Sequence, residues 1–390
     1  MTVALSGAAW CAVAVLLLFT ARRAVFLAAS LFPGRAYGDE ALPTVALLVP
    51  ARNEAACIRA TLDAIASLDY PAGRLTVVLI DDGSTDSTGE QLRGWAEGRP
   101  RVLLLHLPSP AGKFPALNRA VALAPDVEVI AVCDADLRPH RDWLRALVAP
   151  FADGRVGSTA GLISPRNAER GPVARYAAVE SWVHQLITSA AKDRLGLGPP
   201  TLGASAYRLA ALQEVGMFLG AGPGGDVRTS AALTRAGWRA CFVRDAVVDN
   251  DVVDRWDDYW HQHVRWARNV FSTARPGSSM RMRPTLLTRA EALATAAGYA
   301  DRIVLVIVVA LTAAGLLPLF PLTTYFVIVV AEVAVAVARA GRASRLPVYL
   351  LTTACFFVVD VAASFAAAAL ELTHRPRRWR QIRHDLPESP

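Results

Sequence analysis

The chain has 390 residues, of which 53% are hydrophobic and only 19% are charged. This composition is rare in soluble enzymes, so it predicts spans that cross a membrane. The net charge is +7, but no nucleic-acid recognition module accompanies the basic residues, and the five scattered cysteines support neither a zinc site nor a disulfide framework.

The first predicted element is an apolar segment from Thr2 to Thr20 that contains no charged residue. It is long enough to cross the hydrocarbon core of a bilayer. Arg22 and Arg23 follow the apolar run instead of preceding it, and no cleavage site is visible. We therefore interpret residues 1–33 as a membrane anchor and not as a signal peptide.

Residues 44–268 have ordinary globular composition and are expected to form one domain. Short apolar runs typical of buried strands alternate with helical patterns, at 45–49, 75–80, 102–106 and 127–132. This alternation predicts an α/β fold with a parallel sheet, whose ligands bind beyond the carboxyl ends of the strands. A further strand near 157–162 and helices around 173–191 are assigned to the acceptor-facing half.

Carboxylates follow two of the predicted strands. Asp134 and Asp136 come directly after the fourth strand and could hold a divalent cation that bridges a nucleotide diphosphate. Asp81 and Asp82 follow the second strand and could accept hydrogen bonds from a base or a ribose. The alternative for both pairs is a structural role in a turn or at a helix start. For the helix after the second strand, Asp86 or Ser87 is expected to be the capping residue.

Three further features carry candidate chemistry. Lys113 follows a glycine and could neutralise phosphate, although a surface lysine at a helix start is the alternative. Asp226 follows the glycine-rich segment 220–225 and could be a catalytic carboxylate or a helix cap. The third feature is a group within about one helical turn, Gln262, Arg265 and Trp266. The forked guanidinium of Arg265 could bind a diphosphate, and the indole face of Trp266 could stack on a sugar ring. Its alternative is an interfacial Trp and Arg near the bilayer.

The C-terminal third is expected to be a membrane region. Residues 269–300 carry Arg275, Arg281, Arg283 and Arg289 among apolar residues, so we expect an amphipathic connector. Residues 301–373 contain about three hydrophobic spans, and 374–390 form a basic tail.

The predicted topology contains a conflict. Arg22 and Arg23 favour a cytoplasmic globular domain, but one anchor and three later spans would then place the basic tail outside. We therefore expect one run to be re-entrant or interfacial, with the break between Pro318 and Pro321 as the candidate.

These motifs, in this order, resemble the membrane-bound branch of glycosyltransferase family two, which includes cellulose, chitin and hyaluronan synthases and ceramide glucosyltransferase. The resemblance covers roughly residues 45–268 and rests on the following set: Pro50–Glu54, Asp81–Ser84, Gly112–Lys113 with Ala116–Asn118, Asp134–Asp136, Gly203–Arg208, Asp226, and the Gln-x-x-Arg-Trp motif Gln262–Trp266. One departure is Gly225, because family members usually have an acidic residue immediately before the catalytic aspartate.

The resemblance implies an A-type glycosyltransferase fold with a mostly parallel sheet and transmembrane helices at both ends. It also implies inverting transfer that depends on Mg²⁺ or Mn²⁺, with Asp226 as the general base and Asp249 or Asp251 as alternatives. Asp136 and Asp134 would bind the metal, and Gly203, Ser205 and Trp266 would face the acceptor. The implied nucleotide-sugar-binding residues are Ala51, Arg52, Glu54, Asp81, Asp82, Lys113, Asp134, Gln262, Arg265 and Trp266.

The expected function is transfer of a sugar from a nucleotide-diphosphate donor, with UDP as the expected nucleotide, to a membrane lipid or lipid-linked acceptor. The expected location is a bacterial inner membrane with the catalytic domain in the cytoplasm, and the oligomeric state stays open. The main alternative is a processive polysaccharide synthase. About four spans, two of which carry only the isolated carboxylates Glu332 and Asp360, are too few to line a polymer tunnel.

Two other functions are weaker. A polyprenyl-phosphate glycosyltransferase shares the Asp-Asp turn and the paired aspartates but lacks the Gln-x-x-Arg-Trp motif. An inactive scaffolding subunit would not need candidates at every catalytic position, and this chain has them.

Overall fold

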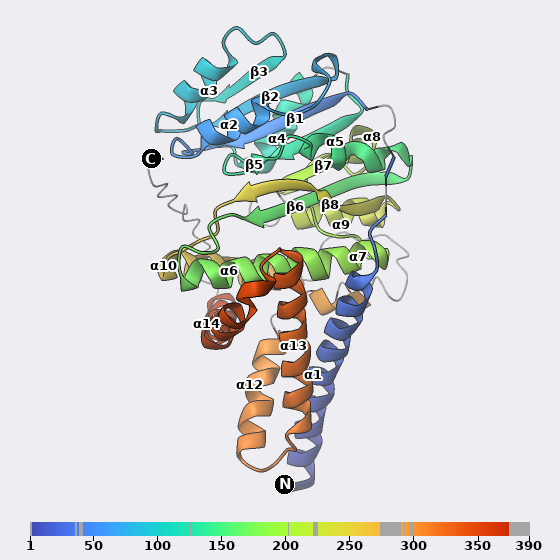
Figure 1. Ribbon diagram of the computed structural model, residues 1–390, viewed down its shortest axis with the longest axis vertical. Helices are drawn as coiled ribbons and strands as arrows, with labels where there is room; N and C mark the ends of the chain where they lie inside the picture. The colour runs from blue at the N-terminus through green and yellow to red at the C-terminus, as the bar shows by residue number, and fades with distance from the viewer. Residues whose placement is uncertain are drawn as a thin grey trace. The chain divides into compact units, whose positions relative to one another are not determined.

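The structure, a computed structural model, describes residues 2–35, 37–38, 42–124, 126–201, 203–220, 225–273, 290–291, 293–295 and 300–373 (Figure 1). These residues form two compact units. We call the described parts of Met1–Phe32, Asn167–Ala191 and Val252–Ile382 the helical unit, and those of Pro33–Arg166 and Lys192–Asp251 the sheet unit. The four arginines of the expected connector and the expected basic tail lie outside the described residues.

The division into units does not follow the order of the sequence. Residues 167–191 and 252–268 fall within the single globular domain expected over 44–268, but they pack in the helical unit together with the apolar helices. Among the described residues, the chain leaves the sheet unit after Arg166, returns to it at Lys192 and leaves it again after Asp251.

The sheet unit contains one eight-stranded sheet with the order β3-β2-β1-β4-β7-β6-β8-β5 (Figure 1). Its strands are β1 (Val45–Ala51), β2 (Leu75–Asp82), β3 (Val102–Leu107), β4 (Val129–Cys133), β5 (Arg138–Pro139), β6 (Val156–Pro165), β7 (Ala204–Arg208) and β8 (Arg239–Asn250). The four strands predicted first, β1 to β4, are mutually parallel as expected. β7 is antiparallel to both β4 and β6, so the whole sheet is mixed.

Helices cover both faces of this sheet. Alternate residues of each strand point to opposite sides, so Leu47 and Val49 of β1 face one core while Ala46 and Leu48 face the other. The first core includes α2 (Ile58–Ala66), α3 (Thr88–Ala96) and α5 (Trp143–Val148). The second includes α4 (Lys113–Leu123), α8 (Leu209–Glu214) and α9 (Gly225–Arg235). Continuous apolar strands are therefore explained by burial on both faces.

Long apolar helices dominate the helical unit. Its elements are α1 (Thr2–Leu31), α6 (Pro172–Trp182), the π-helical turn Val183–Ser189, the start of α7 (Ala190–Arg194), α10 (Trp256–Thr273), α12 (Ala300–Ala313), α13 (Phe320–Arg339) and α14 (Leu346–Leu372). By length and composition, three described helices could cross a membrane, over Gly7–Leu31, Phe320–Arg339 and Ala343–Leu372. α12 has 14 residues and is about 21 Å long, whereas a hydrocarbon core is roughly 30 Å thick. Whether it crosses the membrane stays a prediction.

Charged residues inside these helices are paired. Arg23 lies within α1, and its guanidinium contacts Asp301 at 3.1 Å and Glu332 at 2.8 Å. Arg302 contacts Asp360 at 3.1 Å. Glu332 and Asp360 are isolated along the sequence but not in the fold, so describing them as isolated carboxylates was wrong.

Candidate active site

The loops that follow β1 and β2 are joined by side-chain hydrogen bonds. Asn53 adopts a left-handed backbone with φ of 56°, and its side-chain oxygen accepts from the amide of Thr85 at 2.8 Å. The amide of Glu54 donates to the hydroxyl of Thr88 at 2.8 Å. Asp86 accepts from the amide of Thr88, the first residue of α3, at 3.0 Å, whereas Ser87, the N-cap residue, makes no side-chain capping hydrogen bond. The Pro50–Glu54 segment is thus fixed against the Asp-Asp turn.

Asp82 positions the loop that begins α4. Its two carboxylate oxygens accept from the amides of Ala111 at 2.7 Å and Gly112 at 2.9 Å. Gly112 has φ of 93°, a backbone conformation that favours glycine, and Lys113 follows it directly. Asp82 therefore orients the segment that presents Lys113, and its predicted contact with a nucleoside stays a prediction.

Asp81 is buried and lies beside a histidine that is not among the residues predicted from the sequence. Its oxygens accept from the amide of Ser84 at 2.9 Å and contact Nδ1 of His106 at 2.9 Å. His106 is the fifth residue of β3, and its side chain is 53% exposed. A histidine at the carboxyl end of a strand next to an aspartate turn was the available signal.

Lys113 and Asp134 form an ion pair between the start of α4 and the end of β4. The ammonium lies 2.7 Å from Oδ1 and 2.9 Å from Oδ2 of the carboxylate. Burial would lower the pKa of Lys113, but the charges of Asp134 and Asp226 outweigh it and raise the pKa above its ordinary value. Lys113 is thus held as a cation beside two candidate catalytic carboxylates.

Gly203 allows the backbone of β7 to approach Asp134 closely. The amide of Asp134 donates to the carbonyl of Gly203 at 2.9 Å, and a Cβ at position 203 would lie 2.3 Å from the Asp134 carboxylate. Ser205, two residues on, is buried in the sheet, and its hydroxyl donates to Tyr207 at 3.2 Å. The structure therefore gives Gly203 a packing reason, while the acceptor roles expected of Gly203 and Ser205 stay predictions.

Asp226 lies in the first turn of α9. Burial raises the pKa of its carboxyl group, and Asp134 adds to this effect, while Lys113 opposes it. The preceding Gly225 packs against an aromatic ring, because a Cβ there would lie 2.2 Å from Cε2 of Phe114. A side chain at position 225, such as the acidic residue expected there from the resemblance, would therefore overlap the Phe114 ring in this structure.

Glu54, Asp134 and Asp136 are electrostatically coupled. Burial raises the pKa of Glu54 to about 7, and after an opposing hydrogen bond from Cys57 the next contributions come from Asp136 and Asp134. Such mutual repulsion means that this end of the sheet disfavours further negative charge and favours a cation. Carboxylate oxygens are the ligands that Mg²⁺ and Mn²⁺ prefer, so the residues fit the expected metal.

The remaining predicted residues differ in their surroundings. Ala51 is buried at the end of β1, and Arg52 is exposed. Gln262, Arg265 and Trp266 lie on α10 in the helical unit, not in the sheet unit. Trp266 is 43% exposed, and burial lowers the pKa of Arg265. The structure therefore brings these three residues together on one helix.

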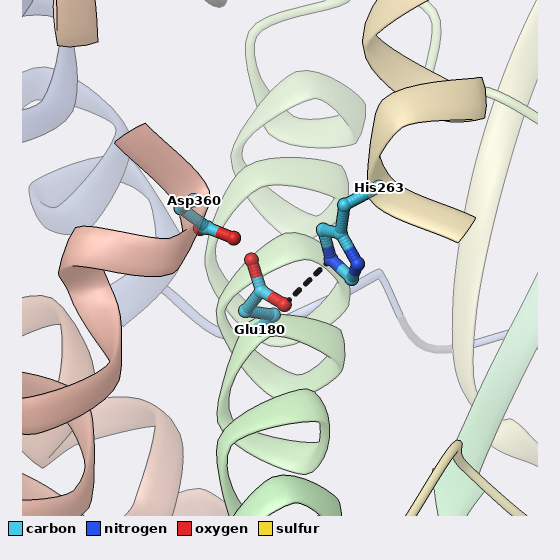
Figure 2. A group of neighbouring side chains, drawn as sticks. All are labelled: Glu180, His263 and Asp360. Atoms are coloured by element: carbon cyan, nitrogen blue, oxygen red, sulfur yellow. Dashed lines mark ion pairs between the residues drawn. The ribbon is translucent and has the colours of Figure 1, made fainter. Parts of the chain in front are cut away.

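A second group of ionisable side chains lies within the helical unit. Figure 2 shows Glu180 of α6, His263 of α10 and Asp360 of α14, whose ligand atoms lie within 4.8 Å of one another and could hold a metal ion. Nε2 of His263 is 2.8 Å from Glu180, and Tyr259 donates to Glu180 at 2.7 Å. Because side chains of the protein already supply positive charge and donors here, this group does not need a cation.

Comparison with known proteins identifies the domain. Residues 46–216 match the family described as glycosyl transferase family 2. An N-acetylglucosaminyltransferase of Rhizobium meliloti (strain 1021) is 31% identical over 241 residues, which cover 59% of this chain and 56% of that protein. The beta-monoglucosyldiacylglycerol synthase of Nostoc sp. (strain PCC 7120) is 30% identical over 238 residues, covering 59% and 49%. This chain therefore spans about half the length of these curated relatives.

A solved structure resembles nearly the whole chain. It is the mannosyltransferase PcManGT from Pyrobaculum calidifontis in complex with GDP-Man and Mn²⁺, with 25% sequence identity and a TM-score of 0.64. The likeness covers 96% of this chain and 98% of that one. Together with the family match over residues 46–216, it shows that this chain has the A-type glycosyltransferase fold and that its domain over 46–216 is similar to glycosyl transferase family 2.

Proposed function

We propose that this chain is a membrane-bound inverting glycosyltransferase that depends on Mg²⁺ or Mn²⁺ and transfers a sugar from a nucleotide-diphosphate donor to a lipid or lipid-linked acceptor. The observation that carries the proposal is the coupling of Lys113 to both Asp134 and Asp226. One cation, Lys113, beside the half-buried Asp226 and beside Asp134, which is proposed to bind metal, suits a reaction in which a diphosphate leaves while a hydroxyl attacks.

Asp226 is proposed as the general base. The acceptor oxygen forms a bond to the anomeric carbon as the bond from that carbon to the diphosphate oxygen breaks, and the electron pair of the broken bond leaves with the diphosphate. The proton of the attacking hydroxyl passes to the Asp226 carboxylate. A pKa raised by burial makes this carboxylate a stronger base than an exposed aspartate.

Asp136 and Asp134 are proposed to hold the metal, which when bound would stabilise negative charge on the diphosphate. Lys113 would contribute a second positive charge on the leaving group, and Arg265 is proposed to bind the same group through its guanidinium. Asp81 and Asp82 are proposed to hold the nucleoside, and Trp266 to face the acceptor or the departing nucleotide.

The acceptor is proposed to be a lipid hydroxyl or a lipid-linked sugar. Three helices of the described chain are long and apolar enough to cross a membrane, which supports catalysis close to a bilayer. The relative from Nostoc is named for a diacylglycerol product, which agrees with a lipid acceptor. We also propose that the protein lies in a bacterial inner membrane with its catalytic domain on the cytoplasmic side.

UDP is the nucleotide that we propose first, on the resemblance to the processive and lipid-directed enzymes. A guanosine nucleotide is the second candidate, because the mannosyltransferase that resembles nearly the whole chain was solved with GDP-Man. The two candidates are separated by thermal stabilisation of the purified enzyme with a panel of UDP- and GDP-sugars and Mn²⁺, since a ligand that binds only the folded state raises its stability.

Transfer itself is tested with radiolabelled donor and extracted lipids, followed by separation of organic-phase glycolipid from high-mass polymer. We expect label in the glycolipid. Label confined to polymer contradicts single addition and favours the processive alternative. If the enzyme neither binds nor hydrolyses any nucleotide sugar of the panel, the result would support an inactive scaffolding subunit.

A further inference from the structure

α10 has two distinct faces. Tyr259, His263 and Ala267 recur at four-residue spacing and are 0%, 4% and 0% exposed. Residues four apart stack on one side of a helix that has 3.6 residues per turn. Gln262 and Trp266 share the neighbouring side, where Trp266 is 43% exposed. The rotation of α10 about its axis therefore decides where the residues of the Gln-x-x-Arg-Trp motif point.

Two neighbouring helices hold the buried face of α10. The hydroxyl of Tyr259 lies 2.7 Å from Glu180 of α6 and 2.5 Å from Asp360 of α14. One turn along α10, Nε2 of His263 lies 2.8 Å from Glu180 (Figure 2). Contacts at two successive turns fix both the rotation of α10 about its axis and its position along that axis. We call this group the α10 polar cluster: Tyr259, His263, Glu180 and Asp360.

The α10 polar cluster is close to balanced in charge. Its two carboxylates face the guanidinium of Arg302, which is 3.1 Å from Asp360, and the imidazole of His263. A hydroxyl has one hydrogen, so Tyr259 donates to one carboxylate at a time, and its other contact is a hydrogen bond when that carboxyl group carries a proton. Buried networks of this kind specify one arrangement of the helices that they join.

We propose that the α10 polar cluster is a positioning group for the transfer reaction: it holds α10 in the rotation that presents Gln262, Arg265 and Trp266 to the donor and acceptor. This inference rests on the proposed function, because it assumes that these three residues contact reacting molecules. The cluster itself contacts no substrate in this scheme and acts only through α10.

The test compares two substitutions, each of which removes a tyrosine hydroxyl that contacts the Asp360 carboxylate. Tyr259→Phe removes the oxygen on α10, whereas Tyr176→Phe removes an α6 hydroxyl that donates to Asp360 at 3.1 Å. Tyr176→Phe is the control, because Oδ2 of Asp360, which loses the Tyr176 hydroxyl, keeps its contact with Arg302. We expect Tyr259→Phe to lower kcat/KM about 10- to 100-fold, since small misplacements of binding groups have effects of this size. Tyr176→Phe should change it by less than about threefold. Melting temperatures are measured in parallel, and Tyr259→Phe should show the larger fall because it also loses the contact with Glu180.

Equal losses of activity in the two variants, or wild-type activity in Tyr259→Phe, would overturn the inference. Arg265→Ala and Trp266→Ala are measured in the same assay. If these variants lose transfer and Tyr259→Phe does not, only the positioning role fails. If Arg265→Ala and Trp266→Ala both retain wild-type transfer, the proposed use of the motif fails and the positioning role fails with it.

A second variant, His263→Gln, keeps a donor toward Glu180 but cannot carry a charge. Burial lowers the pKa of His263, but Glu180 and then Asp360 outweigh this effect and raise the pKa above its ordinary value. The groups that face it are Glu180, Asp360 and Tyr259, with Arg302 beyond Asp360. Wild-type activity should therefore fall as pH rises through this raised pKa, and the fall should disappear in His263→Gln. An unchanged alkaline limb in the variant contradicts the role.

Discussion

The two units of this chain both contain carboxylates close together, but the two groups differ in how their charge is compensated. In the sheet unit, Glu54, Asp134, Asp136 and Asp226 are electrostatically coupled, and Lys113 is the cation that contacts Asp134. These carboxylates raise one another's pKa, so keeping them charged together costs free energy that a positive ligand would reduce.

In the helical unit the same comparison gives the opposite result. Glu180 and Asp360 face His263 and Arg302, and a tyrosine hydroxyl lies between the two carboxylates. Buried ion pairs of this kind specify structure more than they stabilise it. Proximity of carboxylates alone therefore does not identify a metal site, and the balance of charge around them is the better criterion.

The largest effect is expected for Asp226→Asn, which keeps the shape of the side chain and removes the proton acceptor. We expect kcat to fall about 10²- to 10⁴-fold while donor affinity is nearly unchanged. Asp249→Asn is the matched control, because Asp249 was an alternative base and pairs with His140 at 3.0 Å. If Asp226→Asn retains more than about a tenth of wild-type kcat, a loss of only about 1.4 kcal/mol, the assignment is wrong.

The next largest effect tests the comparison between the two groups directly. Asp136→Ala should abolish the Mn²⁺-dependent part of nucleoside-diphosphate binding, measured by calorimetry with UDP and GDP, a loss of about 10- to 100-fold in affinity. Glu180→Gln, in the helical unit, should leave the Mn²⁺ stoichiometry unchanged, and the binding that remains should still depend on Mn²⁺. Loss of bound Mn²⁺ in Glu180→Gln, with normal binding in Asp136→Ala, would reverse the assignment of the two groups.

Metal binding should also depend on pH through Glu54. Its pKa of about 7 means that, without a cation, the carboxyl group is mostly protonated below that pH. A cation favours the ionised form, so it must compete with a proton below pH 7 and gains affinity as the pH rises toward 8, by at most about tenfold per pH unit. Titration with Mn²⁺ at pH 6, 7 and 8 measures this. Glu54→Gln should flatten the dependence, and an equally steep dependence in that variant would exclude Glu54 as its source.

The smallest effect concerns Gly225, which precedes the proposed general base Asp226. Gly225→Ala should destabilise the fold by about 1–3 kcal/mol, because its Cβ would overlap the Phe114 ring. Gly154→Ala is the control, since nothing lies within 4 Å of a Cβ at that glycine. Denaturant unfolding of the two variants measures the difference, and equal stabilities would show that the ring moves aside without penalty.

The core of the sheet unit could be predicted from the sequence because its strands are continuous apolar runs with polar residues at their carboxyl ends. β7 was not predicted as a strand, and its residues entered only as the motif Gly203–Arg208 of the resemblance, since Ala204–Arg208 is five residues long and includes Ser205. β8 escaped prediction because charged residues such as Arg244 and Asp245 interrupt its pattern, and its pairing with β6 shifts register after Gly161.

The candidate residues were predictable one by one, but their partners were not. Lys113 and Asp134 are 21 residues apart, and His106 and Asp81 are 25 apart, so no local pattern reports either contact. The division into two units was likewise hidden, because residues 167–191 have the composition of the domain that surrounds them in sequence but pack with distant helices. Long-range pairing is set by the fold and is not a local property of the chain.

The pairing of Arg23 within α1 has a consequence for how the protein is made. Its partner Glu332 follows 309 residues later, and at ribosomal rates of about 5–20 residues per second that distance takes roughly 15–60 s to synthesise. During this interval α1 carries an arginine that lacks its final counter-charges in a segment able to enter the bilayer. The helical unit therefore cannot complete its assembly during translation of its first helix, and a ribosome that stops before α12 leaves a nascent chain in which Arg23 has neither of these two carboxylate partners.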